Sequence, residues 1–156
     1  MANVTPAHET EGIALLLTTV SRLHRRLGDF TTGLHIAYDF GDGSGLVPSL
    51  FVEEHPAGPE LRLEHRFGFF ARGDADGSEL RFRAGVTVTP AGYVVTAAVE
   101  ADLELPRGEY GAGVHTLHRE RAVRSSLTDA LSLLEEQVAA VCAMDDVPGR
   151  LGFATR

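Results

Sequence analysis

The fold is decided by residues 80–105, LRFRAGVTVTPAGYVVTAAVEADLEL. Apolar residues alternate with other residues on both sides of the turn at Thr89–Gly92, and a period of two is typical of β-strands that bury one face. A hairpin with this turn sets apolar residues opposite one another in three pairs, which are Val88 with Tyr93, Ala84 with Ala97 and Phe82 with Val99. A slip of one residue would destroy these pairs, so the register is well specified. The opposite face then carries Arg81 across from Glu100.

Alternation extends outward from this hairpin toward the N-terminus. It predicts earlier strands at residues 34–40, 46–53 and 61–69, with turns rich in Gly, Pro, Asp and Ser between them. Short turns require antiparallel neighbours, because parallel strands need long crossover connections. After the hairpin, residues 106–124 leave two possibilities open, a sixth strand at Val114–Arg121 or a short helix. We therefore expect an antiparallel meander of five or six strands.

Two segments outside this meander carry apolar residues at helical spacing, residues 5–28 and 126–145. Thr5-Pro6 suits the start of the first helix, and Gly28 suits its end. Ser126 is a good N-cap for the second helix, because a hydroxyl can accept from the orphaned amides of the first turn. Each helix has one apolar stripe, and each stripe needs a surface to cover.

The simplest arrangement packs both helices against one face of the sheet, because it buries the apolar side of every helix and strand. The sequence therefore predicts an α+β two-layer sandwich in a single domain spanning residues 1–156, a length typical of one domain. The antiparallel sheet is expected over residues 33–105, and residues 146–156 are expected to form a tail. The second face of the sheet is left in contact with water.

Composition excludes several kinds of chemistry. All 14 basic residues are Arg, so Schiff-base catalysis and a P-loop, which need a Lys amine, are ruled out. Cys142 is the only cysteine, which rules out an internal disulfide and a cluster of thiolate zinc ligands. The net charge of −8 argues against nucleic acid as a partner, because such binding depends on neutralising phosphates. We expect no cofactor.

No apolar run approaches the length of a membrane span, and no signal peptide opens the chain. We therefore expect a cytoplasmic protein with no membrane association. His115 and His118 have the only spacing that suits a metal, and on a strand they would point to opposite faces. We expect no metal.

On the inner face, the predicted registers place Tyr38, Pro48, His65, Ala84 and Ala97 roughly in one row. Small residues in that row would leave space beside the Tyr and the His, and pockets between sheet and helix are common ligand sites. In such a pocket His65 could act as a general base and Tyr38 as an acid. The alternative is a core histidine with its ring nitrogens hydrogen-bonded, and helices packed on the alanines.

On the outer face, a register that matches Phe69 with Leu80 places Arg66 opposite Arg83, where like charges repel. The residues that would share this surface are Arg62, Arg66, Arg81, Arg83 and Phe70. Neighbouring glutamates could neutralise the arginines. Alternatively, the surface could meet an acidic partner, because guanidinium groups bind carboxylates in bidentate pairs.

The order of elements is similar to that of small dimeric secretion chaperones and bacterial adaptors, and it also resembles helix-grip and cone-shaped ligand-binding folds. The chain carries no catalytic motif. We therefore predict a non-catalytic binding module, of the adaptor, chaperone or inhibitor and immunity type, that recognises a protein partner or forms a homodimer. The alternative is a protein that binds a small apolar molecule, or a cofactor-free isomerase, cyclase or lyase that uses Tyr38 and His65.

Overall fold

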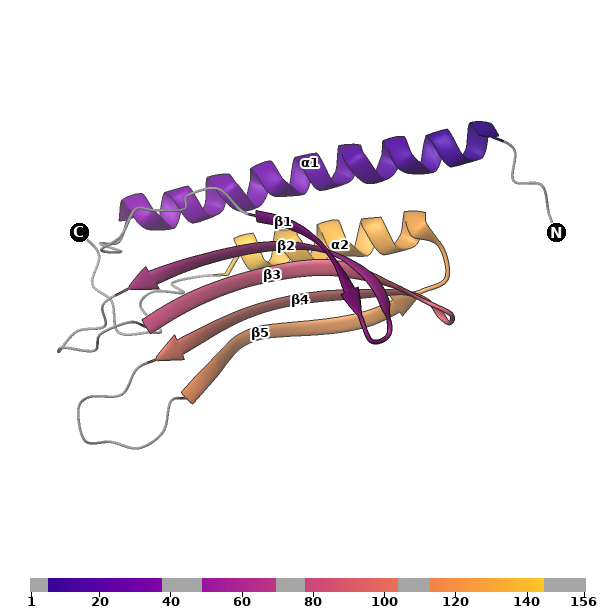
Figure 1. Cartoon of the computed structure of the whole chain (residues 1–156). Coiled ribbons are helices and arrows are strands. Elements are labelled where there is room, and N and C mark those ends of the chain that lie inside the picture. The colour runs from indigo at the N-terminus through magenta and orange to yellow at the C-terminus, as the bar shows by residue number, and fades with distance from the viewer. Residues whose placement is uncertain (1–5, 38–48, 70–77, 104–112, 145–156) are drawn as a thin grey trace.

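A computed structural model describes residues 6–37, 49–69, 78–103 and 113–144. The elements in chain order are α1 (Pro6–Ala37), β1 (Ser49–His55), β2 (Gly58–Phe69), β3 (Ser78–Thr89), β4 (Gly92–Leu103), β5 (Gly113–Arg124) and α2 (Leu127–Cys142). The five strands pair antiparallel in the order β1-β2-β3-β4-β5. Both helices lie over the same face of this sheet (Figure 1). The predicted α+β sandwich is confirmed.

The central hairpin has the register that the alternation predicts. Its Cα partners include Val88 with Tyr93, Ala84 with Ala97, Phe82 with Val99, and Arg81 with Glu100. Gly92 begins β4 with a φ of 128°, and a Cβ there would lie 2.5 Å from the carbonyl oxygen of Arg124. Only glycine therefore fits this turn without strain.

The register between β2 and β3 differs from our prediction by two residues. Phe69 pairs with Ser78 instead of Leu80, so Arg66 lies opposite Arg81 and Glu64 lies opposite Arg83. A shift of two residues keeps every side chain on its predicted face, because the period of a strand is two. Alternation alone therefore could not distinguish the two registers.

Helix α1 is longer than predicted, since it continues past Gly28 to Ala37. The strand expected at residues 34–40 is therefore wrong over residues 34–37, and the rest of it lies outside the described residues. A glycine inside a helix costs about 1 kcal/mol, and packing can outweigh that cost. Phe30 supplies such packing, because its ring meets the edge of Phe82 at a centroid distance of 5.6 Å.

The last strand of the sheet is β5, which settles the open question about residues 106–124 in favour of a strand over the described part of that segment. The sheet consequently extends well past residue 105, our predicted limit. The predicted second helix is confirmed as α2, where the Ser126 hydroxyl accepts a hydrogen bond from the Asp129 amide at 3.1 Å.

The core lies between the helices and the inner face of the sheet. One cluster joins α1 and α2 to the middle strands, and its most buried members are Leu23, Leu63, Val95, Ala97, Ala130, Leu131 and Val138. A second cluster continues the same layer and contains Leu27, Leu80, Phe82, Val99, Ala101 and Val141. The hydrophobic effect of this burial is the main force that holds the two layers together.

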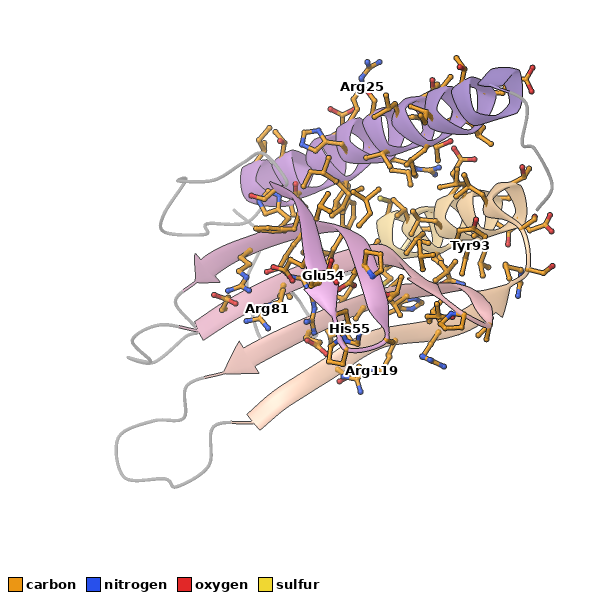
Figure 2. The ribbon with its side chains drawn as sticks, turned by 45° about the vertical axis from the view of Figure 1, so that its right-hand side comes forward. Arg25, Glu54, His55, Arg81, Tyr93 and Arg119 are labelled. Atoms are coloured by element: carbon orange, nitrogen blue, oxygen red, sulfur yellow. The ribbon has the colours of Figure 1, made fainter. Side chains whose placement is uncertain are left out.

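The outer face is partly covered by the protein itself. The hairpin formed by β1 and β2 turns at Ala57 and crosses in front of the other strands, which is visible in both views (Figures 1 and 2). This crossing brings His55 at the tip of the hairpin over β4 and β5, where it shares a groove with Arg119 (Figure 2).

Candidate functional site

The outer-face groove has a volume of about 300 Å³ and draws its walls from every strand of the sheet. Its charged lining consists of Glu60, Arg62, Arg83, Glu100, Arg119, Glu120 and Arg121, with His55 at the hairpin tip. Between these side chains, Thr96 and Ala98 form a floor of small residues. We call this surface the arginine groove.

Glu64 anchors one side of the arginine groove. Its side chain is only 3% exposed, and it forms ion pairs with both Arg62 and Arg66. The pair with Arg62 joins Nε to Oε2 at 3.2 Å, but these two atoms are not aligned for a hydrogen bond. Burial of a carboxylate is costly without compensation; Arg66 hydrogen-bonds one oxygen of Glu64, and the other oxygen has only the nearby charge of Arg62.

Glu100 anchors the other side. Its side chain is 8% exposed and lies between Arg83 and Arg119, whose Nη2 donates to Oε1 at 2.7 Å. Burial by itself would raise the pKa of Glu100, but the hydrogen bond from Arg119 and the charge of Arg83 outweigh burial and lower the pKa below its ordinary value. The carboxylate is therefore held in its charged form.

Arg62 also fixes the hairpin that covers the groove. Its guanidinium lies 5.5 Å from the ring centre of Phe51, and its Nη2 donates to Glu53 at 3.1 Å. Both partners belong to β1, so a single side chain of β2 holds the outer face of the edge strand. The position of the hairpin tip over the groove thus depends partly on this contact.

Glu100 is shared by two arginines, so its cluster keeps an excess of one positive charge, whereas Arg62 of the Glu64 cluster also pairs with Glu53 and Glu60 and leaves no such excess there. Arg121 adds to this excess, because it forms no ion pair with any described residue. The side chain of Arg119 is 65% exposed. In a chain with a net charge of −8, the arginine groove is a local surface suited to carboxylates.

The predicted partner-binding residues divide into three groups. Arg62 and Arg83 line the groove, and Arg66 joins it through Glu64. Arg81 lies beside them but pairs with Glu79 at 2.6 Å, and this hydrogen bond raises the pKa of the guanidinium. Phe70 lies outside the described residues.

Sequence reasoning placed Glu100 on this face, opposite Arg81, but it missed Arg119 and Arg121. The alternation of arginines in residues 118–124, HRERAVR, was the available signal. It could not be used while the choice between strand and helix stayed open, because the two structures place these side chains differently.

His65 is not in the row that the registers predicted. Its Cα partner is Phe82 instead of Ala84, because of the two-residue shift described above. The side chain is 2% exposed, and Nδ1 lies 3.1 Å from the hydroxyl of Thr31 on α1. The Thr31 proton donates to the Leu27 carbonyl at 2.9 Å, so its oxygen can accept from His65.

The alanines of the predicted pocket belong to the core. Ala84 and Ala97 are 4% and 1% exposed and share a cluster with Leu23 of α1 and Leu131 of α2. The helices therefore cover the surface on which a ligand was considered. Tyr38 and Pro48 lie outside the described residues, so a catalytic pair of Tyr38 and His65 stays a prediction.

Metal and thiol chemistry find little support in the described ranges. Among residues 6–37, 49–69, 78–103 and 113–144, no group of three or more His, Cys, Asp or Glu side chains could hold a metal ion. His115 and His118 both lie on β5. Burial raises the pKa of the Cys142 thiol, which is the opposite of what a nucleophile needs.

Comparison of the chain with protein-family models, with curated proteins and with solved structures gives no match. Within the described part of the chain, neither helix is both long and apolar enough to cross a membrane.

Proposed function

We propose that this protein is a non-catalytic binding module of the cytoplasm, of the adaptor, chaperone or inhibitor type, that takes up an acidic segment of a protein partner in its arginine groove. The observation that carries the proposal is the buried Glu100 carboxylate, which is shared by Arg83 and Arg119 beside Arg121 in the groove. In this part of the groove Arg83, Arg119 and Arg121 outnumber Glu100 and Glu120, which leaves a local excess of one positive charge on an acidic protein. Carboxylates are the groups that such a surface binds best.

The buried glutamates also prepare the arginines for binding. A free arginine side chain loses rotamer freedom when it binds, and that loss reduces affinity. Arg83 and Arg119 are already held by Glu100, so part of that loss has occurred in the unbound protein. Their remaining N–H groups can then bind a carboxylate of the partner with a smaller loss of side-chain conformational entropy.

The shape of the groove suits an extended segment. Thr96 and Ala98 keep the floor low, and a low floor lets a peptide backbone lie close to the sheet. His55 at the hairpin tip lines the groove together with Arg119 and Arg121 of β5. Acidic side chains of the segment would face these two arginines.

The proposal is tested by charge reversal on β5. Arg121→Glu lies in the groove, whereas Arg124→Glu changes the same charge on the same strand at a residue outside the groove lining. Tagged wild-type protein and both variants are purified from the native host, and co-purified proteins are quantified by mass spectrometry. The binding of an acidic peptide from the identified partner is then measured by fluorescence anisotropy.

We expect Arg121→Glu to weaken binding of that peptide at least about tenfold and Arg124→Glu to weaken it less than about threefold, since rim charges contribute modestly. Wild-type binding should also weaken as salt rises from low to physiological ionic strength. Equal binding by all three proteins would overturn the proposal, as would a partner segment without acidic residues.

A further inference from the structure

β1 is an edge strand of the sheet. It pairs with β2 on one side, and no described strand pairs with it on the other side. All seven of its residues are exposed, including three consecutive apolar ones, Leu50, Phe51 and Val52. An unpaired edge presents a row of backbone N–H and C=O groups, which can form a ladder with a strand of another molecule.

The opposite edge of the sheet is protected against such pairing. β5 carries Arg119, Glu120 and Arg121 in succession, and charged side chains on an edge strand discourage the addition of another strand. β1 instead presents an apolar side chain, Val52, that is 76% exposed. The edge of β1 is therefore the one that suits an added strand.

β1 also runs along the arginine groove. Phe51 and Glu53 both contact Arg62, which lines the groove. His55, at the end of the strand, lines the groove itself. β1 crosses in front of the other strands (Figures 1 and 2), and neighbouring strands of a sheet lie about 5 Å apart. A strand added to the edge of β1 would therefore lie over the outer face, beside the arginines of the groove.

We propose that the acidic segment of the partner binds as a sixth strand, paired through its backbone with the outer edge of β1. This inference rests on the proposed function, because it specifies how the arginine groove holds that segment. Backbone hydrogen bonds provide affinity without regard to sequence, and the side chains of the added strand determine specificity.

One face of the added strand lies on the groove side. Successive side chains of a strand point to opposite faces, so every second side chain shares the face that carries Phe51 and His55. The positive charge of this side comes from Arg83, Arg119 and Arg121. Acidic side chains are therefore favoured at every second position of the segment.

The other face of the added strand lies beside Leu50, Val52 and Glu54 of β1. Leu50 and Val52 are 50% and 76% exposed, and apolar side chains of a neighbouring strand would remove part of this surface from water. Glu54 repels acidic side chains on the same face. The partner segment therefore alternates, with acidic residues on the groove side and apolar residues between them.

The test uses two synthetic eight-residue peptides of identical composition, one in which Glu and Val alternate and one with four Glu followed by four Val. Binding of each fluorescein-labelled peptide to the full chain is measured by fluorescence anisotropy at low ionic strength. The alternating peptide should bind at least about fivefold more tightly, because only that peptide places every Glu on the groove side and every Val beside Leu50 and Val52.

Single N-methylation along the alternating peptide tests the backbone pairing. Alternate residues of a strand direct their N–H groups toward a given neighbouring strand, and an N-methyl group removes the donor. Binding should weaken at least about fivefold at every second position and less than about twofold at the positions between them. Binding through side chains alone would not show this alternation.

Val52→Glu and Val123→Glu are matched changes at exposed positions on the two edge strands. Val52→Glu should weaken binding of the alternating peptide at least about fivefold, because it replaces an apolar contact with a second acid beside Glu54. Val123→Glu should weaken it less than about twofold, since Val123 lies on β5 outside the groove lining.

Arg121→Glu separates this inference from the proposed function. If Arg121→Glu weakens binding of both peptides but N-methylation shows no alternation, the segment binds in the groove without forming a strand, and only this inference is overturned. If Arg121→Glu changes the affinity of neither peptide, the proposed function is overturned. Absence of binding by the alternating peptide, equal binding of the two peptides, or equal effects of Val52→Glu and Val123→Glu would also overturn this inference.

Discussion

The two faces of β3 differ completely although their residues alternate along one strand. Phe82 and Ala84 point toward the helices and are at most 4% exposed, whereas Arg81 and Arg83 point to the outer face and form ion pairs. The inner face is held by apolar contact, which is non-directional and tolerates small changes in geometry. The outer face is held by charged hydrogen bonds, which require specific partners.

This difference assigns folding mainly to one face of the sheet and recognition mainly to the other. Residues of the inner face determine whether the chain folds, because they bury most of the apolar surface. Residues of the outer face contribute less to folding, and their excess of positive charge is available for recognition. We therefore expect variants of the inner face to lower mainly stability and variants of the outer face to lower mainly partner binding.

The largest effect is expected from Phe82→Ala. This change removes a side chain that is 1% exposed and packs against Phe30, so the free energy of unfolding should fall by about 3–5 kcal/mol. Arg81→Ala on the outer face is the control and should cost less than about 1 kcal/mol, since it breaks one partly exposed ion pair. Urea unfolding measures both. Similar losses would show that the two faces do not differ as described.

Glu100→Gln removes a buried charge from the outer face and so measures what that charge contributes to stability. It should lower the free energy of unfolding at pH 7 by about 2 kcal/mol, because hydrogen bonds to charged groups are among the stronger ones. Glu120→Gln, in the same groove, is the control and should have little effect, because Glu120 is exposed and forms no ion pair with a described residue.

The effect of Glu100→Gln should also depend on pH. The pKa of Glu100 is lowered by folding from its ordinary value of 4.5, so its stabilisation is complete above that value and is lost as pH falls through the lower folded pKa. The difference between wild type and variant should therefore shrink below about pH 4. A difference that is the same at pH 7 and pH 3.5 would contradict the lowered pKa.

Thr31→Val tests the buried polar contact between α1 and β2. The variant keeps the shape of the side chain but removes the hydroxyl that lies 3.1 Å from His65 Nδ1, so stability should fall by about 1–2 kcal/mol. Thr128→Val, at an exposed site on α2, is the matched control. If thermal unfolding of both variants matched wild type, the Thr31 contact would contribute nothing to holding α1 on the sheet.

The smallest effect on stability is expected from Arg121→Glu. Arg121 is exposed and forms no ion pair with a described residue, so the free energy of unfolding should change by less than about 0.5 kcal/mol. Partner binding should nevertheless fall strongly, as proposed above. A large loss of stability would mean that Arg121 belongs to the folding of the outer face instead of its recognition surface.

The sequence predicted those parts of the fold in which local pattern and packing agree. The hairpin around Thr89–Gly92 was predicted residue by residue, because its apolar pairs exclude a slip of one position. The register between β2 and β3 was not predicted correctly, because a slip of two residues preserves the alternation of apolar residues. The extension of α1 past Gly28 was missed because contacts such as Phe30 with Phe82 lie far apart in the sequence.

The site was predictable only in part for the same reason. Arg62 and Arg83 were identified from the alternation of their own strands. The arginines of β5 enter the groove because the β1–β2 hairpin crosses the sheet, and no local pattern encodes that crossing. Glu64 and Glu100 became central only through their burial, which depends on the neighbours that the register supplies.

Site-specific photo-crosslinking in the native host tests the arginine groove most directly. A benzophenone amino acid is placed at Thr96 on the groove floor and, as a control, at Ser132 on the exposed side of α2. We expect crosslinks from Thr96 to join an acidic segment of a partner protein and to be lost when Arg121→Glu is added, while Ser132 gives none to that segment. Crosslinks to the same segment from Ser132, or from Thr96 regardless of Arg121→Glu, would contradict this expectation.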